Sequence, residues 1–280
     1  MADVQQLLDE ALSLGEEGRW EEMANLLRIV LRDHEDDPYV LSWLGVAERE
    51  LGNDGVAYEF FKRCWAAEPL DPHVLAVCGA GLAAFDDPEA ASVLRAAALT
   101  GPDVPIARLQ YGAYLAREGL FAEALEQLNA AVELDPEDPT IRGELGIALA
   151  LKGDLAGAAE AMEAVLEMAP DDSWTRVLLG LVYVETGSME EAAETLIRAA
   201  EERTDDGEAL VLAALAAAAA GWSDAAEDAI ARVEYAAENV DAEVVEEARE
   251  RIEDGADAAR QMLTETLAPA ALHDRLMQPL

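Results

Sequence analysis

The chain has 280 residues, of which 52% are hydrophobic and only 5% aromatic, and 59 acidic against 19 basic residues give it a formal net charge of -40. Alanine and leucine therefore supply most of the apolar surface, which favours helices packed at close range. The basic residues are scattered among carboxylates, which excludes nucleic acid and anionic membrane surfaces as partners, because phosphate binding needs clustered lysine and arginine.

The N-terminus and the apolar runs of the chain predict its location. The N-terminal stretch has neither a basic segment nor an apolar segment of the secretory type. The longest apolar run, residues 209–220, is shorter than the roughly 20 residues that span a bilayer. We expect a cytoplasmic protein that does not insert into a membrane.

Small residues recur along the chain at a fixed period. Turn positions fall on Gly18, Gly52, Asp86, Gly119, Gly153, Gly187 and Gly221, with spacings of 34, 34, 33, 34, 34 and 34 residues. A second small position precedes most of these turns, at Gly45, Gly79, Gly112, Gly146 and Gly180. An alanine follows them at Ala57, Ala91, Ala124, Ala158, Ala192 and Ala226, and a closing proline stands at Pro69, Pro136 and Pro170.

This combination of period, register and residue type resembles the tetratricopeptide repeat (TPR) family, whose unit is a helix-turn-helix of about 34 residues. The resemblance implies an all-α fold, a right-handed α-solenoid superhelix of antiparallel helix pairs. We expect seven repeats over residues 1–240, starting near residues 4, 38, 72, 105, 139, 173 and 207. Gly112 and Ala124 fall where the two helices of the fourth repeat cross. In the third repeat, we expect the second helix to run from Pro88 to near Leu99.

After residue 240 the repeat register stops, and we expect a capping helix and a short tail over residues 241–280. Asp241 is the predicted N-cap, and apolar residues recur at helical spacing after it. Gly255 is expected to bend this helix and Pro269 to end it. The tail then carries its large apolar residues on one side: Leu272, Leu276 and Met277.

Residues that carry chemistry are few. The histidines His34, His73 and His273 fall in three regions of an elongated solenoid, so they cannot form a metal site or a catalytic pair. Cys64 and Cys78 stand at core positions of adjacent helices, and we expect buried neighbours without a redox role. We therefore expect no enzyme, no catalytic residue, no cofactor and no metal.

The resemblance implies a peptide-binding groove on the concave side, lined by the first helix of each repeat. The positions carried over are Tyr39, Ser42, Val46, Arg49, His73, Ile106, Leu109, Ala113, Ile147, Trp174, Val177, Leu181 and Val184. None of them is lysine or asparagine, which disfavours the family's grip on a terminal carboxylate. We expect an apolar or amphipathic helical peptide. Two alternatives stay open: these side chains are core, or the C-terminal tail occupies the groove or docks on a second copy.

The expected function is a non-catalytic protein-protein interaction scaffold or adaptor, of the assembly-factor or co-chaperone type. The alternative is a regulatory or substrate-docking subunit of an enzyme complex. The acid excess is typical of a halophilic protein, because charge repulsion is screened over about 3 Å at 1 M salt. The other explanation is an acidic adaptor that has a basic partner on its outer surface.

Overall fold

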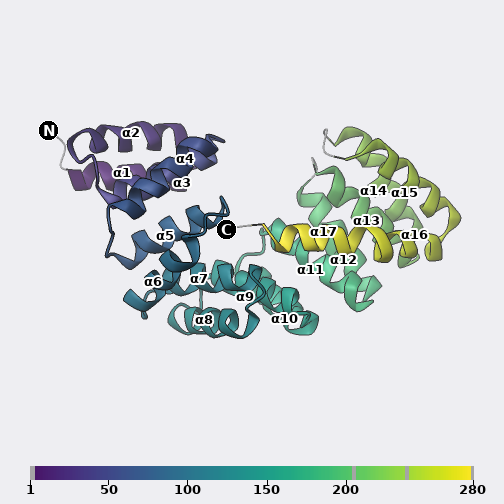
Figure 1. Ribbon diagram of the computed structural model, residues 1–280. Coiled ribbons are helices and arrows are strands. Elements are labelled where there is room, and N and C mark those ends of the chain that lie inside the picture. Colours follow the sequence, from purple (N-terminus) through teal and green to yellow (C-terminus); the bar gives the residue numbers. More distant parts are fainter. Residues whose placement is uncertain (1–3, 204–205, 237–239, 279–280) are drawn as a thin grey trace. The chain divides into compact units, whose positions relative to one another are not determined.

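The computed structural model describes residues 4–203, 206–236 and 240–278. Within these ranges the backbone forms helices and turns and contains no strand, which confirms the all-α prediction. The chain divides into two compact units, with the boundary between Asp135 and Pro136, and Figure 1 labels the helices of both. Residues 237–239, at the end of the predicted seventh repeat, and the last two residues of the predicted tail lie outside the described ranges.

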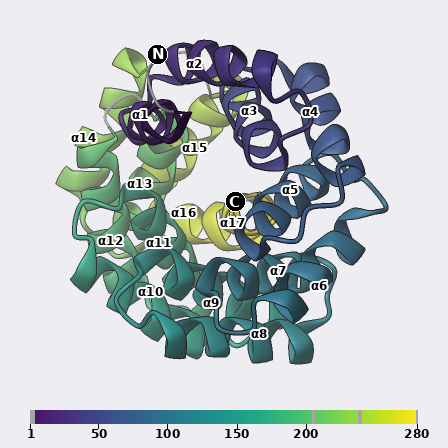
Figure 2. The ribbon, with the colours of Figure 1, turned by 90° about the vertical axis from the view of Figure 1, so that its left-hand side faces the viewer.

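The first unit consists of four helix pairs in chain order. Its helices are α1 (Val4–Glu16), α2 (Trp20–Asp33), α3 (Pro38–Glu50), α4 (Asp54–Ala66), α5 (Pro72–Ala83), α6 (Ala90–Thr100), α7 (Pro105–Arg117) and α8 (Phe121–Leu134). Each odd-numbered helix packs against the even-numbered helix that follows it, as Figure 2 shows. The odd-numbered helices also pack on one another, α3 on α5 and α5 on α7, so they form a layer of their own.

The second unit begins with three further pairs and ends with a C-terminal segment. The paired helices are α9 (Pro139–Lys152), α10 (Leu155–Met168), α11 (Ser173–Thr186), α12 (Met189–Glu202), α13 (Gly207–Ala219) and α14 (Ser223–Arg232), followed by a 3-10 turn at Val233–Tyr235. The C-terminal segment comprises α15 (Ala242–Asp254), α16 (Ala256–Met262), a π-helical turn, η2 (Leu263–Leu267), and α17 (Ala268–Leu276). The pairing of α9 to α14 repeats that of the first unit.

An Asp-Pro pair starts several of the first helices. The carboxylates of Asp37, Asp71 and Asp138 accept hydrogen bonds from the backbone N–H two residues later, at 2.9, 2.8 and 2.8 Å. The proline that follows each aspartate needs no hydrogen-bond acceptor in the first turn, and its φ already suits a helix. Each such cap stabilises its helix by about 0.5–2 kcal/mol.

The turn between the two helices of each pair has a left-handed residue. The six turn glycines have φ between +71° and +86°: Gly18, Gly52, Gly119, Gly153, Gly187 and Gly221. Asp86, which fills the gap in the glycine series, also has a positive φ of 53°. Aspartate tolerates this conformation better than most residues because its short polar side chain can hydrogen-bond locally. The turn therefore has the same backbone form in the third pair as in the others.

The second set of glycines lies where the two helices of a pair cross. A Cβ on Gly112 would stand 2.7 Å from Leu128 Cγ and 3.2 Å from the Ala124 carbonyl oxygen. On Gly180 it would stand 2.6 Å from Leu196 Cγ. These distances to the leucine carbons are too short for carbon atoms, which confirms that small residues permit the close approach of the helices.

The second helix of the third pair begins at Ala90, two residues after the predicted start at Pro88. Pro88 and Glu89 form a turn instead, in which Asp87 Oδ1 accepts a hydrogen bond of 2.8 Å from the Glu89 N–H. Burial opposes ionisation of Asp87. Hydrogen bonds from this N–H, from Tyr58 (2.7 Å) and from Lys62 (3.1 Å) outweigh it and lower the pKa of the carboxyl below its usual value.

The C-terminal segment differs from the prediction. Asp241 caps α15 as expected, accepting a hydrogen bond of 2.9 Å from the Glu243 N–H. Gly255, with φ of 107°, separates α15 from α16. Pro269 does not end the helix: it is the second residue of α17, and the helix continues to Leu276. The π-turn before it explains this, because the Ala268 N–H bonds the Leu263 carbonyl five residues back and the backbone accommodates a proline there.

Candidate functional site

The predicted groove residues of the first unit fall into two groups. Tyr39, Val46, Arg49 and Ile106 are half-buried and His73 is exposed. The others belong to the interior: Ser42, Leu109 and Ala113 are buried. Ser42 donates a hydrogen bond of 2.9 Å to the Tyr39 carbonyl oxygen, so its polar group is satisfied inside the helix. Only the first group is in a position to contact a ligand.

In the second unit the equivalent residues are covered. Val177, Leu181 and Val184 on α11 are at most 2% exposed, and Ile147 on α9 is 8% exposed. All four belong to one apolar cluster with buried residues of α16, η2 and α17, and Trp174 packs against that cluster. The predicted groove positions therefore coincide here with a surface that a helix covers. We call Trp174, Val177, Leu181 and Val184, together with Glu208 and Val211 of α13, the α11–α13 face.

The C-terminal helix runs along this face. Helix α16 packs on α13, the π-turn η2 on α13 and α11, and α17 on α11 and α9. Figure 1 shows α16 and α17 as one continuous yellow helix over α13 and α11. The described part of the predicted tail therefore packs on the first helices α11 and α9 of the second unit.

One side of the C-terminal helix is buried. Its buried residues are Ala259, Met262, Leu263, Ala268, Ala271, Leu272, Arg275 and Leu276. In a regular helix, the buried residues from Ala268 onward would lie on a different side from those up to Leu263. The π-turn inserts one residue and so keeps both groups on the same side. Met277, predicted to join them, is 40% exposed.

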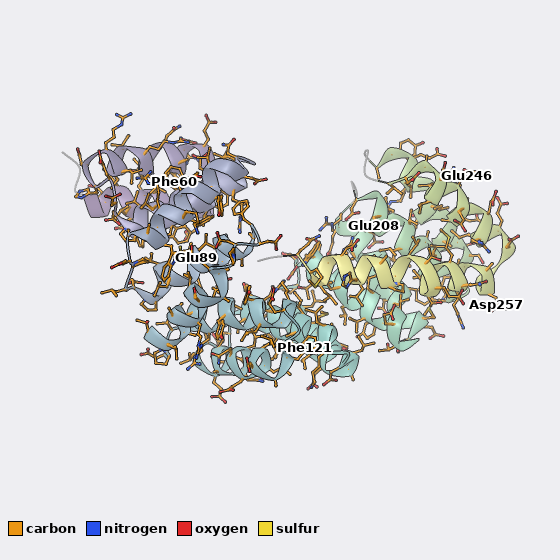
Figure 3. All side chains as sticks on the ribbon, in the orientation of Figure 1. Phe60, Glu89, Phe121, Glu208, Glu246 and Asp257 are labelled. Carbon is orange, nitrogen blue, oxygen red and sulfur yellow. The ribbon has the colours of Figure 1, made fainter. Side chains whose placement is uncertain are left out.

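Two arginines anchor the C-terminal helix. Arg275, only 8% exposed, donates a hydrogen bond of 2.5 Å from Nη2 to Glu208 Oε2, and its Cζ lies 5.7 Å from the centroid of the Trp174 ring. Figure 3 labels Glu208 beside α17. Arg260 Nη2 donates at 2.9 Å to the carbonyl oxygen of Ala219, the last residue of α13. The roles of Arg275 and Glu208 were not predicted from the sequence; the one signal was an arginine within the apolar side of the tail.

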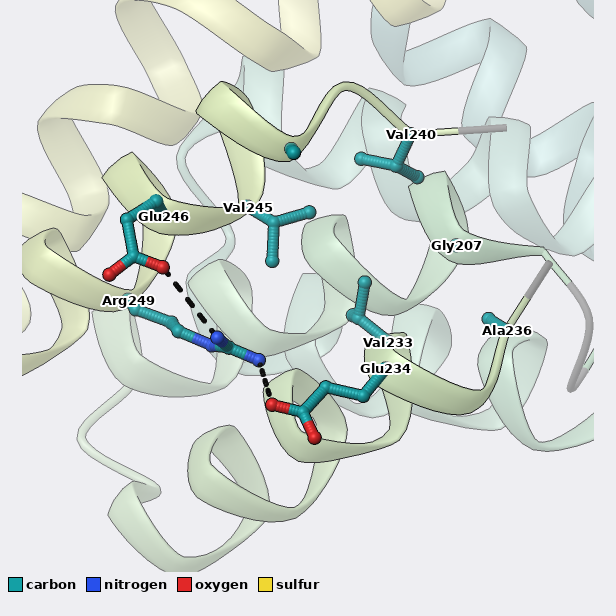
Figure 4. A pocket seen from close by; sticks show the side chains of 9 residues that line it. Gly207, Val233, Glu234, Ala236, Val240, Val245, Glu246 and Arg249 are labelled. Carbon is teal, nitrogen blue, oxygen red and sulfur yellow. Dashed lines mark hydrogen bonds and ion pairs between the residues drawn. The ribbon is translucent and has the colours of Figure 1, made fainter. Parts of the chain in front are cut away.

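Cavities also lie away from this face, and two of them are lined by described residues that carry charge. One, of about 280 Å³, lies between α15 and the 3-10 turn at Val233–Tyr235, with Gly207, Val233 and Val245 among its lining residues (Figure 4). Arg249 at its rim pairs with Glu234 at 2.8 Å and with Glu246 at 3.6 Å, so its charge is already matched. This contact joins α15 to the preceding turn rather than presenting a charged site.

The other cavity, of about 640 Å³, lies in the first unit between α4 and α6. Its lining includes Trp65, Leu70 and Leu75, with Lys62 and Glu89 at its charged edge. Lys62 forms ion pairs with Asp87 and Glu89, which raise the pKa of its ammonium group. Leu70 is 84% exposed and gives this part of the outer surface an apolar character that was not predicted from the sequence.

The two cysteines are buried free thiols, as predicted. The neighbouring Cys64 thiol, together with burial, raises the pKa of the Cys78 thiol well above its usual value, and Cys78 Sγ donates a hydrogen bond of 3.4 Å to the Phe61 carbonyl oxygen. A protonated, inaccessible thiol is a poor nucleophile. Among the described residues, no three His, Cys, Asp or Glu side chains are grouped so as to hold a metal ion.

None of the described helices has both the length and the apolar composition needed to cross a membrane. Sequence profiles described as tetratricopeptide repeat match residues 8–72, 86–139 and 114–173 in one case and 149–218 in another. The chain belongs to the tetratricopeptide repeat family. Proteins of this family are in general non-catalytic scaffolds for protein interactions. No match is found among curated proteins.

Solved structures show the same fold. The Cut9-Hcn1 hetero-tetramer of APC/C aligns with a TM-score of 0.69 at 17% identity, over 85% of this chain and 48% of that chain. PilF of Pseudomonas aeruginosa aligns with a TM-score of 0.60 at 17% identity, over 76% and 96%. A thermophilic TPR protein of Thermus thermophilus aligns with a TM-score of 0.55 at 26% identity, over 64% and 98%. This chain spans about half the length of the Cut9-Hcn1 chain that it matches.

Proposed function

We propose that the chain is a non-catalytic scaffold that binds an apolar or amphipathic partner helix on the first helices of its first unit. In this proposal, seven repeats over residues 1–240 form the scaffold and residues 241–280 cap it. The observation that carries the proposal is the seating of the chain's own amphipathic helix on α13, α11 and α9. The first helices of this chain can therefore bind another helix, because their side chains have the spacing that such a ligand requires.

The first unit offers partly exposed apolar side chains at these positions. Tyr39 on α3 and Ile106 on α7 are half-buried, as is their equivalent Trp174. Val46 on α3 is also half-buried, whereas its equivalent Leu181 on α11 is fully covered. Burial of such partly exposed apolar side chains contributes about 25 cal/mol per Å², before the cost of ordering the partner is subtracted. The first unit therefore has apolar surface left with which to bind a partner.

Affinity purification of partners from the native source, at native salt, tests the proposal. Ile106→Glu places a charge on the proposed surface and is expected to reduce partner recovery about ten-fold or more. Ile106 is preferable to Leu109, which is 6% exposed, because a charge at Leu109 would disrupt the core instead.

Val56→Glu is the matched control, because Val56 is 47% exposed on α4, a second helix. Equal recovery with Ile106→Glu and with the unaltered chain would contradict the proposal. Both variants need unchanged helical circular dichroism. If the recovered partner is an enzyme, the chain acts as the regulatory or docking subunit of that complex.

A further inference from the structure

The α11–α13 face is an apolar surface that requires a cover. Val177, Leu181 and Val184 share one apolar cluster with buried residues of α17, and α17 packs on α11, so its departure would expose apolar surface of α11 next to Trp174. Exposed stripes of this kind bind apolar or amphipathic helices. The docked helix shows which ligand the surface accepts.

That ligand has a defined pattern. The residues that α17 buries are Ala268, Ala271, Leu272, Arg275 and Leu276, which recur every three to four positions. Small residues allow the helix to lie close to α11, and the arginine meets both Glu208 and the Trp174 ring. A helix from another protein needs the same spacing and an arginine in the same register.

The hold on α17 is weaker than that on the helices beneath it. Only five of its nine residues are buried, and the other four are exposed, so it removes little apolar area from water. Glu208 is 48% exposed, so solvent screens its ion pair with Arg275. Arg275 Nε is buried without a hydrogen-bond partner, an unsatisfied donor that opposes docking. By contrast, every residue of α13 except Glu208 is buried.

Charge identifies the class of helix that would compete. The chain has a net charge of -40, and the solvent side of the C-terminal helix adds the exposed carboxylates of Asp257, Glu265 and Asp274. These groups repel the rest of the chain. A helix with lysine or arginine in their place would be attracted instead, and this attraction raises both specificity and the rate of association.

We propose that the α11–α13 face binds a basic amphipathic helix of a partner protein that carries an arginine in the register of Arg275, and that this helix displaces α17. The proposal deepens the proposed function, on which it rests for the use of first helices as binding surfaces. It concerns the second unit, so the Ile106→Glu experiment and the following one can fail separately.

Fluorescence anisotropy of labelled synthetic peptides on the full chain tests the proposal. The basic probe is residues 256–278 with Asp257→Lys, Glu265→Lys and Asp274→Lys. A chain with Leu272→Glu and Leu276→Glu, which releases its own helix, is expected to bind this probe about ten-fold or more tightly than the unaltered chain, where the tethered helix competes at an effective millimolar concentration. Equal affinity for the two chains would overturn the proposal.

Two further probes separate the contribution of charge to the affinity from that of the arginine. The native-sequence peptide is expected to bind the released chain about three-fold or more weakly than the basic probe in dilute buffer. A basic probe with Arg275→Ala is expected to bind about five-fold or more weakly than the basic probe itself. If charge or arginine has no effect on affinity, the proposed partner chemistry is wrong.

If the variant with Leu272→Glu and Leu276→Glu fails to fold, hydrogen exchange of the unaltered chain tests the proposal instead. Millimolar basic probe is expected to accelerate hydrogen exchange at residues 268–276 about five-fold or more, and no acceleration would overturn the proposal. Light scattering serves as the last control. A dimer of the unaltered chain at assay concentration, lost with Leu272→Glu and Leu276→Glu, would assign the face to a second copy and would also overturn it.

Discussion

Replacing Gly81 by alanine is expected to lower the free energy of unfolding by about 1–3 kcal/mol in urea titrations. The reason is the ring of Phe61, which is fully buried on α4. A Cβ on Gly81 of α5 would fall inside the contact distance of that ring, and a Cβ on Gly45 of α3 would stand 2.5 Å from its Cε1. The ring is thus held between two glycines from neighbouring pairs.

Removal of the Phe61 ring should reverse the sign of the effect that Gly81→Ala has on the free energy of unfolding. Phe61→Ala alone is expected to cost about 3–5 kcal/mol. In that background, Gly81→Ala should stabilise the chain by about 0.5–1 kcal/mol, because alanine restricts the unfolded chain more than glycine does. Gly55→Ala on α4 is the control, because no atom lies within 4 Å of the added Cβ apart from Gly55, its chain neighbours and the backbone of its own helix. If the changes in the free energy of unfolding caused by Gly81→Ala and Phe61→Ala simply add in the double variant, the Phe61 ring is not what excludes a Cβ at Gly81.

Reversing the charge of Arg275 is expected to release α17 and to cost about 2 kcal/mol. Breaking a buried ion pair costs about 3–5 kcal/mol, but solvent reaches Glu208, which reduces the loss. The measurement is urea unfolding of Arg275→Glu, of Glu208→Arg and of the double variant. The double variant should recover at least half of the loss, since the pair is restored with opposite polarity.

Arg251→Glu provides the matched control for this pair. Arg251 and Glu247 form an ion pair of 3.1 Å on α15, where both side chains are about half exposed. Its disruption is expected to change the free energy of unfolding by about 0.5 kcal/mol or less. A similar loss at Arg251 and Arg275, or no recovery in the double variant, would show that the contact with Glu208 does not hold α17.

The repeat register was readable from the sequence because each small residue has one geometric reason. Gly119 is needed for a left-handed turn and Gly112 for close helix packing, and both reasons recur at the same interval. Asp86 stood in the gap of the glycine series and adopts the same backbone form. The division into two compact units after Asp135 had no counterpart in the sequence, since the Pro-Glu-Asp-Pro link there resembles the other links.

The candidate site was only partly predictable. Repeat register identified Val177 and Leu181 as positions on a first helix, but coverage depends on a segment far along the chain: Arg275 and Glu208 are 67 residues apart. Pro269 was a misleading stop signal, because proline usually ends a helix. The π-turn that accommodates it has no sequence pattern comparable to the glycine series.

Hydrogen exchange of the unaltered full chain, followed by mass spectrometry, tests most directly whether the C-terminal helix occupies the α11–α13 face. Amides of α17, residues 268–276, should exchange about a hundred-fold or more slowly than in an unstructured peptide, and yet faster than those of α13. This order follows from the docking of α17 by few apolar contacts and one screened ion pair. Exchange of residues 268–276 at the rate of an unstructured peptide would contradict the docking of this helix.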